Sequence, residues 1–110
     1  MQKVIYKYSI SSRDIPELLT NPRNAPFKIE MVKGAEILAV ATQAEFNEQG
    51  IPQETGKIWC LCDPDQEEKE ERQFVLVETG KDFDKSDNMK YTGTYQLYGG
   101  QIVLHLFEII

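Results

Sequence analysis

Two cysteines and one histidine are the side chains of this sequence best suited to metal binding or nucleophilic chemistry. Cys60 and Cys62 stand two residues apart, and with His105 they are the only residues of their kinds. A structural zinc site takes four ligands, commonly as two close pairs, and the sequence holds no second pair. On a strand the two thiols share a face, whereas Asp63 would point to the other face. Because free cysteine is often a buried, hydrophobic residue, we predict two core thiols and neither metal nor cofactor.

No catalytic motif accompanies these residues. His105 stands in the apolar stretch IVLHLF, which is typical of a half-buried, hydrogen-bonded histidine on a strand. The sequence leaves open a triad of one cysteine, His105 and an acid brought together by folding, and nothing in it favours one. We therefore predict no catalytic residue and no enzyme.

The acidic run, residues 63–71, is the one biased segment of the chain. It fails the calcium-loop pattern, which needs glycine at the sixth place and glutamate at the twelfth, where the sequence has Glu68 and Phe74. A run like this is usually a solvated connection, but its carboxylates are also candidates to bind a basic partner. Binding residues concentrate in loops on a rigid scaffold, so we name as candidates these acids and two arginines of the loop 13–25: Asp63, Asp65, Glu67, Glu68, Glu70, Glu71, Arg13 and Arg23.

Length and charge restrict the class of protein. With 110 residues the chain predicts a single domain over 1–110. The net charge of −6 disfavours direct binding to nucleic acid or to an anionic membrane. The sequence contains neither an apolar stretch of roughly 18 residues nor an N-terminal signal-peptide pattern, so a cytoplasmic protein is expected. The apolar end, Phe107, Ile109 and Ile110, fits either self-association into a homo-oligomer or packing into the chain's own core.

Alternation of apolar and polar residues dominates the chain and predicts strands. One short helix is expected over about Ile15 to Thr20, where Asp14 can cap it and Pro16 falls in the first turn. In the third strand, Leu38 and Val40 are expected to oppose Ile37 and Ala39. The segments 44–56 and 80–89 are expected to be loops. The predicted strands are 3–10, 27–31, 35–43, 57–63, 72–79, 90–98 and 101–109.

These strands predict a mainly β fold. Gly99-Gly100 between the last two apolar runs is a strong hairpin signal. The connections are too short for the crossovers that a parallel sheet requires. We therefore expect an antiparallel β-sandwich or partly open barrel of about seven strands with one short helix.

Several blocks of the sequence resemble a family of small, uncharacterised proteins of tailed bacteriophages and prophages. The blocks are KVIYKY, GAEILAVATQ, IWCLCDP, the pattern of residues 71–80 and, most specifically, YTGTYQLYGGQIVLHLFE with its LVxHxFE-like end. The resemblance implies a phage origin, a compact β fold and the host bacterial cytoplasm as the location, and it implies no established activity. Two departures stand out: the segment 11–26 is longer than usual, and Lys81 follows Thr79-Gly80 where many members have histidine.

The expected function is that of a non-enzymatic phage accessory protein. It would bind a host macromolecule, most simply a host protein, as a counter-defence inhibitor. One alternative is a protein that sequesters a small, nucleotide-like ligand in a pocket between protomers, with aromatic residues and Thr92-Gly93-Thr94 lining it. A second alternative is a minor structural component of the virion.

Overall fold

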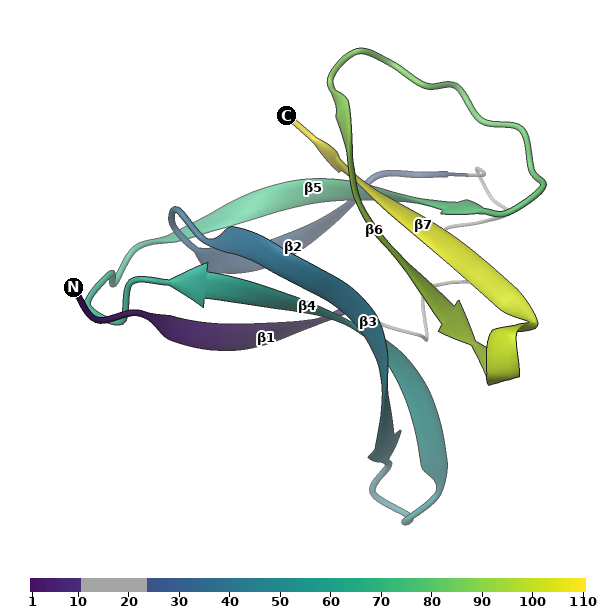
Figure 1. Cartoon of the computed structure of the whole chain (residues 1–110), viewed down its shortest axis with the longest axis horizontal. Coiled ribbons are helices and arrows are strands. Elements are labelled where there is room, and N and C mark those ends of the chain that lie inside the picture. The colour runs from purple at the N-terminus through teal and green to yellow at the C-terminus, as the bar shows by residue number, and fades with distance from the viewer. Residues whose placement is uncertain (11–23) are drawn as a thin grey trace.

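The computed structural model describes residues 1–10 and 24–110, and the regular structure in this part of the chain is almost entirely strands (Figure 1). Tyr98–Gly100 form one turn of 3-10 helix, η1, between the last two strands. The predicted helix of residues 15–20 lies outside the described residues. The seven strands are β1 (Val4–Ile10), β2 (Phe27–Val32), β3 (Glu36–Phe46), β4 (Pro52–Cys62), β5 (Lys69–Glu78), β6 (Met89–Leu97) and β7 (Ile102–Ile109).

The strands form two antiparallel sheets that pack as a sandwich. The three-stranded sheet has the order β1-β4-β3, and the four-stranded sheet has the order β2-β5-β7-β6. Hairpins join β3 to β4 and β6 to β7, whereas β1 pairs with β4 across a long stretch of sequence, from Val4↔Cys62 to Ile10↔Gly56. The prediction of a mainly β, antiparallel fold with seven strands is confirmed, and the barrel is not closed.

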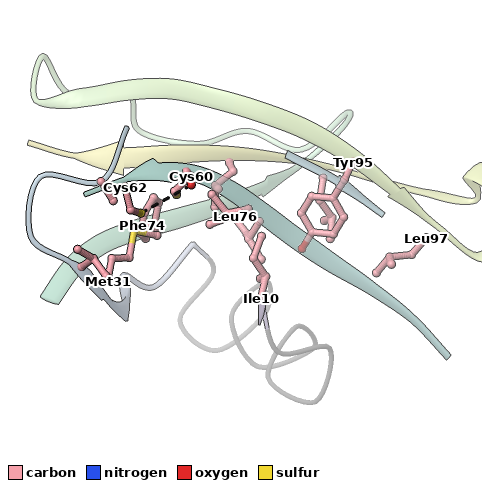
Figure 2. Close-up of a cluster of buried hydrophobic side chains, with 13 residues drawn as sticks. Ile10, Met31, Cys60, Cys62, Phe74, Leu76, Tyr95 and Leu97 are labelled. Atoms are coloured by element: carbon pink, nitrogen blue, oxygen red, sulfur yellow. Dashed lines mark hydrogen bonds between the residues drawn. The ribbon is translucent and has the colours of Figure 1, made fainter. Parts of the chain in front are cut away.

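The core lies between the sheets and is filled by residues at alternate positions of each strand (Figure 2). Ile58, Cys60 and Cys62 supply it from β4, and their exposed fractions are 0–2%. Phe74 and Leu76 face them from β5. Period-two burial of this kind gathers large apolar side chains into one layer. The two cysteines are free and buried, so the prediction of core thiols is confirmed.

A β-bulge in β3 corrects the predicted arrangement of its two faces. The register with β4 shifts between Ile37 and Ala39. Ile37 and Val40 therefore both pack against the core, although strict alternation would place them on opposite faces. Leu38 is left 49% exposed. One extra residue in a strand has this effect because it reverses the side-chain direction beyond it.

The outer face of the four-stranded sheet carries a second apolar cluster. Val75, Val77 and Met89 are buried there, with Phe107 and Ile109 packed against them. Phe83 of the loop after β5 covers Phe107, with ring centroids 5.5 Å apart. Two residues of the apolar end thus pack within the chain, while Ile110 is 78% exposed. Self-association stays a prediction.

The predicted loop 44–56 is wrong, because most of it forms a projecting hairpin. β3 continues to Phe46 and β4 begins at Pro52, so the loop between them shrinks to residues 47–51. Asn47 closes it: its Oδ1 accepts hydrogen bonds of 2.9 Å from the N–H groups of Gln49 and Ile51. β1 ends opposite Gly56, so residues 42–55 extend past it. We call residues 42–55 the arm; they form the far end of the β3–β4 hairpin in Figure 1.

Candidate functional site

The acidic run lies partly in a turn and partly in β5. Asp63 stabilises its own turn, since its Oδ1 accepts a hydrogen bond from the Asp65 N–H at 2.9 Å. Glu70 accepts one from the Gly34 N–H at 3.2 Å and so holds the β2–β3 turn. The predicted solvated connection therefore ends at Glu68, because β5 begins at Lys69.

Two further acids of the run form ion pairs with lysines of the neighbouring segment. Glu68 lies 3.1 Å from Lys33 Nζ, and Glu71 lies 3.8 Å from Lys28 Nζ. All four side chains are more than half exposed, so each pair contributes little to stability. These contacts nevertheless reduce the negative potential of the run. Of the six carboxylates in the acidic run, all except those of Asp65 and Glu67 make these structural contacts. Arg13 and Arg23 lie outside the described residues, and binding by all eight candidates stays a prediction.

The cysteines and the histidine lie on opposite sides of the four-stranded sheet. Cys60 is in the core, where burial foremost, followed by the neighbouring Cys62, raises the pKa of its thiol to about 11. His105 is on the outer face, because its neighbours Leu104 and Leu106 point inward. A cysteine–histidine pair is therefore not formed. Among the described residues, no three side chains of His, Cys, Asp or Glu converge as metal ligands.

His105 is held between two threonine hydroxyls. Its Nε2 lies 2.7 Å from Thr79 Oγ1, and its Nδ1 lies 2.9 Å from Thr94 Oγ1. Tyr91 extends the chain with a hydrogen bond between its hydroxyl and Thr94 Oγ1. The order hydroxyl, imidazole, hydroxyl resembles a catalytic triad of nucleophile, base and orienting group. In a triad, however, the orienting group is a carboxylate that stabilises the imidazolium, and here it is a hydroxyl. The arrangement orients the ring and satisfies both of its nitrogens.

Three large exposed apolar side chains lie in the arm or in the facing turn. Phe46 is 75% exposed, Tyr98 of η1 is 60% exposed and Ile51 is 56% exposed. Between the arm and η1 lies a hollow of about 460 Å³, which we call the arm groove; it is lined by Ala44, Ile51, Pro52, Gln53, Glu54 and Tyr98.

The arm groove continues the core-facing side of the three-stranded sheet. Val40 on β3 and Ile58 on β4 belong to the core or pack against it. Counting by twos along the strands places Ala44 and Phe46, and likewise Glu54 and Pro52, on that same side. The opposite sheet no longer covers these positions. Apolar residues that would be core elsewhere in the sandwich are thus presented to the outside.

Five contacts hold the arm and its base in place. At its base the buried Lys57 pairs with Glu45 and donates a hydrogen bond to Ser9 Oγ at 2.6 Å; the hydrogen bond from Lys57 lowers the pKa of Glu45. On the groove side, Glu54 Oε2 accepts a hydrogen bond from the Tyr98 N–H at 2.9 Å.

The other two contacts join the facing edges of β3 and β6. Thr42 Oγ1 donates to the Gln96 carbonyl oxygen. Gly93 packs so closely on Val40 that a Cβ there would lie 2.6 Å from the valine Cβ. The two walls of the groove are therefore fixed before any partner binds.

Tyr98 adopts a backbone conformation that tyrosine rarely takes. Its φ is 54°, and apart from glycines only Asn24 among the described residues also has a positive φ. The left-handed region costs roughly 1–2 kcal/mol for a residue with a Cβ, and glycine would make the same turn without this cost. Because the tyrosine ring is exposed, little burial of apolar surface offsets this cost. Strained residues persist mainly where function requires them, which makes Tyr98 the strongest candidate binding residue.

A second hollow, of about 510 Å³, opens on the far side of the four-stranded sheet, under the loop that carries Phe83. Its apolar lining includes Val75, Phe83 and Met89, and its polar lining includes Asp82 and Asp84. Its size suits a small molecule. Within the chain, Gly93 packs against Val40 and Thr94 Oγ1 is hydrogen-bonded to His105, and a nucleotide-binding pocket between protomers at Thr92-Gly93-Thr94 stays a prediction.

The arm groove was not recognised from the sequence because the segment 44–56 is polar on average and rich in glycine and proline. The available signal was local. Phe46 and Ile51 flank a stretch with Asn47 and Gly50, which is a pattern typical of a hairpin turn between two apolar positions.

Comparison of the whole chain with known proteins identifies one family. Among the described residues, no helix has the length and apolar character needed to cross a membrane. No curated protein and no solved structure matches the sequence. One family model does, and it covers residues 1–110. The chain therefore belongs to the family described as Domain of unknown function (DUF7352).

Proposed function

We propose that this chain is a non-enzymatic binding protein that holds a partner protein in the arm groove. One observation carries the proposal: the core-facing side of β3 and β4 runs past the opposite sheet and leaves a hollow lined by the exposed Ile51 and by the strained Tyr98 of η1. Aromatic and large aliphatic side chains around a preformed hollow are the usual anchors of protein interfaces. The fixed walls also reduce the entropy lost on binding.

The resemblance to proteins of tailed phages extends the proposal to the partner. A phage accessory protein meets host proteins in the bacterial cytoplasm, so a host protein is the expected occupant and inhibition of a host defence the expected role. This part rests on the resemblance alone, which is most specific in residues 92–108. Infection of a defence-positive and a defence-negative host by phage with and without the gene tests it. Equal plating on both hosts would contradict the role of inhibitor.

The binding proposal is tested by capture with matched variants. Ile51 and Ile5 have nearly equal exposed fractions, 56% and 57%, but Ile5 lies on β1, away from the groove lining. Ile51→Ser should weaken capture of the same partner about tenfold or more, since burial of an isoleucine side chain contributes about 1.5–3 kcal/mol. Ile5→Ser should leave capture unchanged. Equal effects of the two variants would refute a role for the groove.

Tyr98→Gly separates binding from folding. Glycine accepts a φ of 54° without strain, so the melting temperature should stay equal or rise. Capture of the partner should fall, because the exposed ring is lost. A variant that lost stability together with binding would show that Tyr98 serves the turn and not the partner.

The second hollow supports a second candidate function, the binding of a small ligand. Its apolar and polar lining is typical of small-molecule sites, and the carboxylates of Asp82 and Asp84 in this lining favour a neutral or cationic ligand over a phosphate-bearing one. A thermal-shift screen tests this candidate, because a ligand at a hundred times its Kd adds about 2.7 kcal/mol of stability. A stabilising ligand should lose its effect in Phe83→Ser.

A further inference from the structure

We propose that the occupant of the arm groove is an extended peptide segment that alternates apolar with basic residues. The inference rests on the proposed function and names the chemistry of the partner. Two independent features point to it: the sign of the charge around the groove, and the free strand edge that borders it.

Charge around the arm groove is negative. Residues 42–56 contain Glu45, Glu48 and Glu54 and no lysine or arginine, and the facing turn 98–101 is uncharged. Lys57 neutralises Glu45 on the other face of the sheet. Glu48 in the hairpin loop and Glu54 in the groove lining remain. Opposite charge at the rim steers a partner and disfavours wrong ones, so lysine or arginine should flank the apolar anchors of the occupant.

The same charge argues against a second copy of this chain as the occupant. The chain carries a net charge of −6, and two acidic surfaces brought together repel each other. A homo-oligomer through the arm would bury Glu48 and Glu54 of both copies without any basic residue from either arm. A basic segment of another protein meets no such cost.

The backbone beside the groove favours an extended occupant. Among the described strands, β3 is hydrogen-bonded on one side only, to β4. In the arm, residues 43–46 therefore present backbone N–H and C=O groups along a free edge. A peptide strand can add to such an edge. Its side chains then alternate, so every second one would enter the groove between Ile51 and Tyr98.

The experiment uses three labelled eight-residue peptides that alternate Leu with Lys, Leu with Glu, and Ser with Lys. Fluorescence anisotropy measures their affinity for the full chain, and amide chemical shifts locate the bound peptide. We expect saturable binding of the Leu–Lys peptide, with shifts in residues 42–56 and 96–101. The Leu–Glu and Ser–Lys peptides should bind at least tenfold more weakly. Ile51→Ser should weaken the Leu–Lys peptide about tenfold, and Ile5→Ser should not.

Several results would overturn the inference. Shifts confined to residues 63–71 would assign the basic peptide to the acidic run. Equal affinity for the Leu–Lys and Leu–Glu peptides would remove the charge argument while leaving the groove as a binding site. Concentration-dependent shifts in the arm without peptide would show that a second copy occupies it. If neither peptide binding nor partner capture depends on Ile51, the proposed function fails as well.

Discussion

Replacement of Tyr95 by phenylalanine should stabilise the protein. Tyr95 lies in the core with an exposed fraction of 2%, and its ring covers Gly56 (Figure 2). Its hydroxyl is buried and has no hydrogen-bond partner within the described part of the chain. In the unfolded chain the same hydroxyl is hydrogen-bonded to water. Folding of the wild type therefore loses the hydrogen bond between this hydroxyl and water. The Tyr95→Phe variant has no hydroxyl and loses no such bond.

The size of the gain follows from two opposing contributions. Burial of a hydroxyl without a partner costs about 1–3 kcal/mol in proteins. Removal of the oxygen leaves a gap of roughly 10–15 Å³, which costs about 0.3 kcal/mol in lost packing. The free energy of unfolding should rise by about 1–2.5 kcal/mol. For a domain of this size, that is an increase in melting temperature of about 4–10 °C.

Tyr8→Phe provides the matched control. Tyr8 also faces the inside of the sandwich, but its hydroxyl oxygen accepts a hydrogen bond of 3.1 Å from the Val32 N–H. Its removal leaves that N–H without an acceptor and should lower stability by about 0.5–1.5 kcal/mol. Urea unfolding at pH 7, followed by circular dichroism, measures both variants. The reasoning is refuted if Tyr95→Phe loses stability as Tyr8→Phe does.

The pH dependence gives a second readout of Tyr95. Burial raises the pKa of its phenol well above the ordinary value. Above about pH 10 a tyrosine in the unfolded chain loses its proton, while Tyr95 in the folded chain keeps it. The unfolded state then binds fewer protons, so the stability of the wild type falls as pH rises. Tyr95→Phe lacks this loss, and its advantage should widen above pH 10. A constant difference between pH 7 and 11 would contradict the assignment.

Three further substitutions or treatments test the packing. Gly93→Ala should cost about 1–3 kcal/mol in urea unfolding, because its Cβ would lie 2.6 Å from the Cβ of Val40; an unchanged midpoint would show that the β3–β6 edge is loose. Glu108→Gln should lower the free energy of unfolding by about 2 kcal/mol, because it leaves the largely buried Arg72 guanidinium without its charged partner. An unchanged free energy would mean that solvent replaces the carboxylate. Iodoacetamide at pH 8.5 should label Cys60 about a hundredfold more slowly in the native than in the urea-unfolded protein, since burial raises the pKa of its thiol to about 11; equal rates would place the thiol outside the core.

Much of the fold could be predicted because several strands contain short apolar runs bounded by polar residues. Residues 58–62 and 74–77 are apolar throughout, and apolar residues predominate in 102–109; these segments became parts of β4, β5 and β7. The glycine pair at 99–100 marked the last hairpin. Short apolar runs between turn signals are typical of buried strands.

Other features depend on contacts that no local pattern records. The pairing of β1 with β4 joins residues more than 40 positions apart. The bulge at Ile37–Ala39 reverses one face of β3, and the sequence gives no sign of it because residues 37–41 are apolar throughout. The arm was read as a loop because its outer positions are polar and its inner ones face no second sheet. A strand with no opposite layer lacks the continuous apolar side that the pattern search needs.

The order of the strands also has a kinetic consequence. Short turns join β3 to β4 and β6 to β7. By contrast, β1 pairs with β4 and β2 pairs with β5 across long stretches of sequence. Closing a short loop is faster than closing a long one, so the two hairpins should form earliest. These are the hairpins that supply the opposing walls of the arm groove. When the complete chain refolds, both walls of the arm groove should therefore form before the first strand finds its place in the sheet.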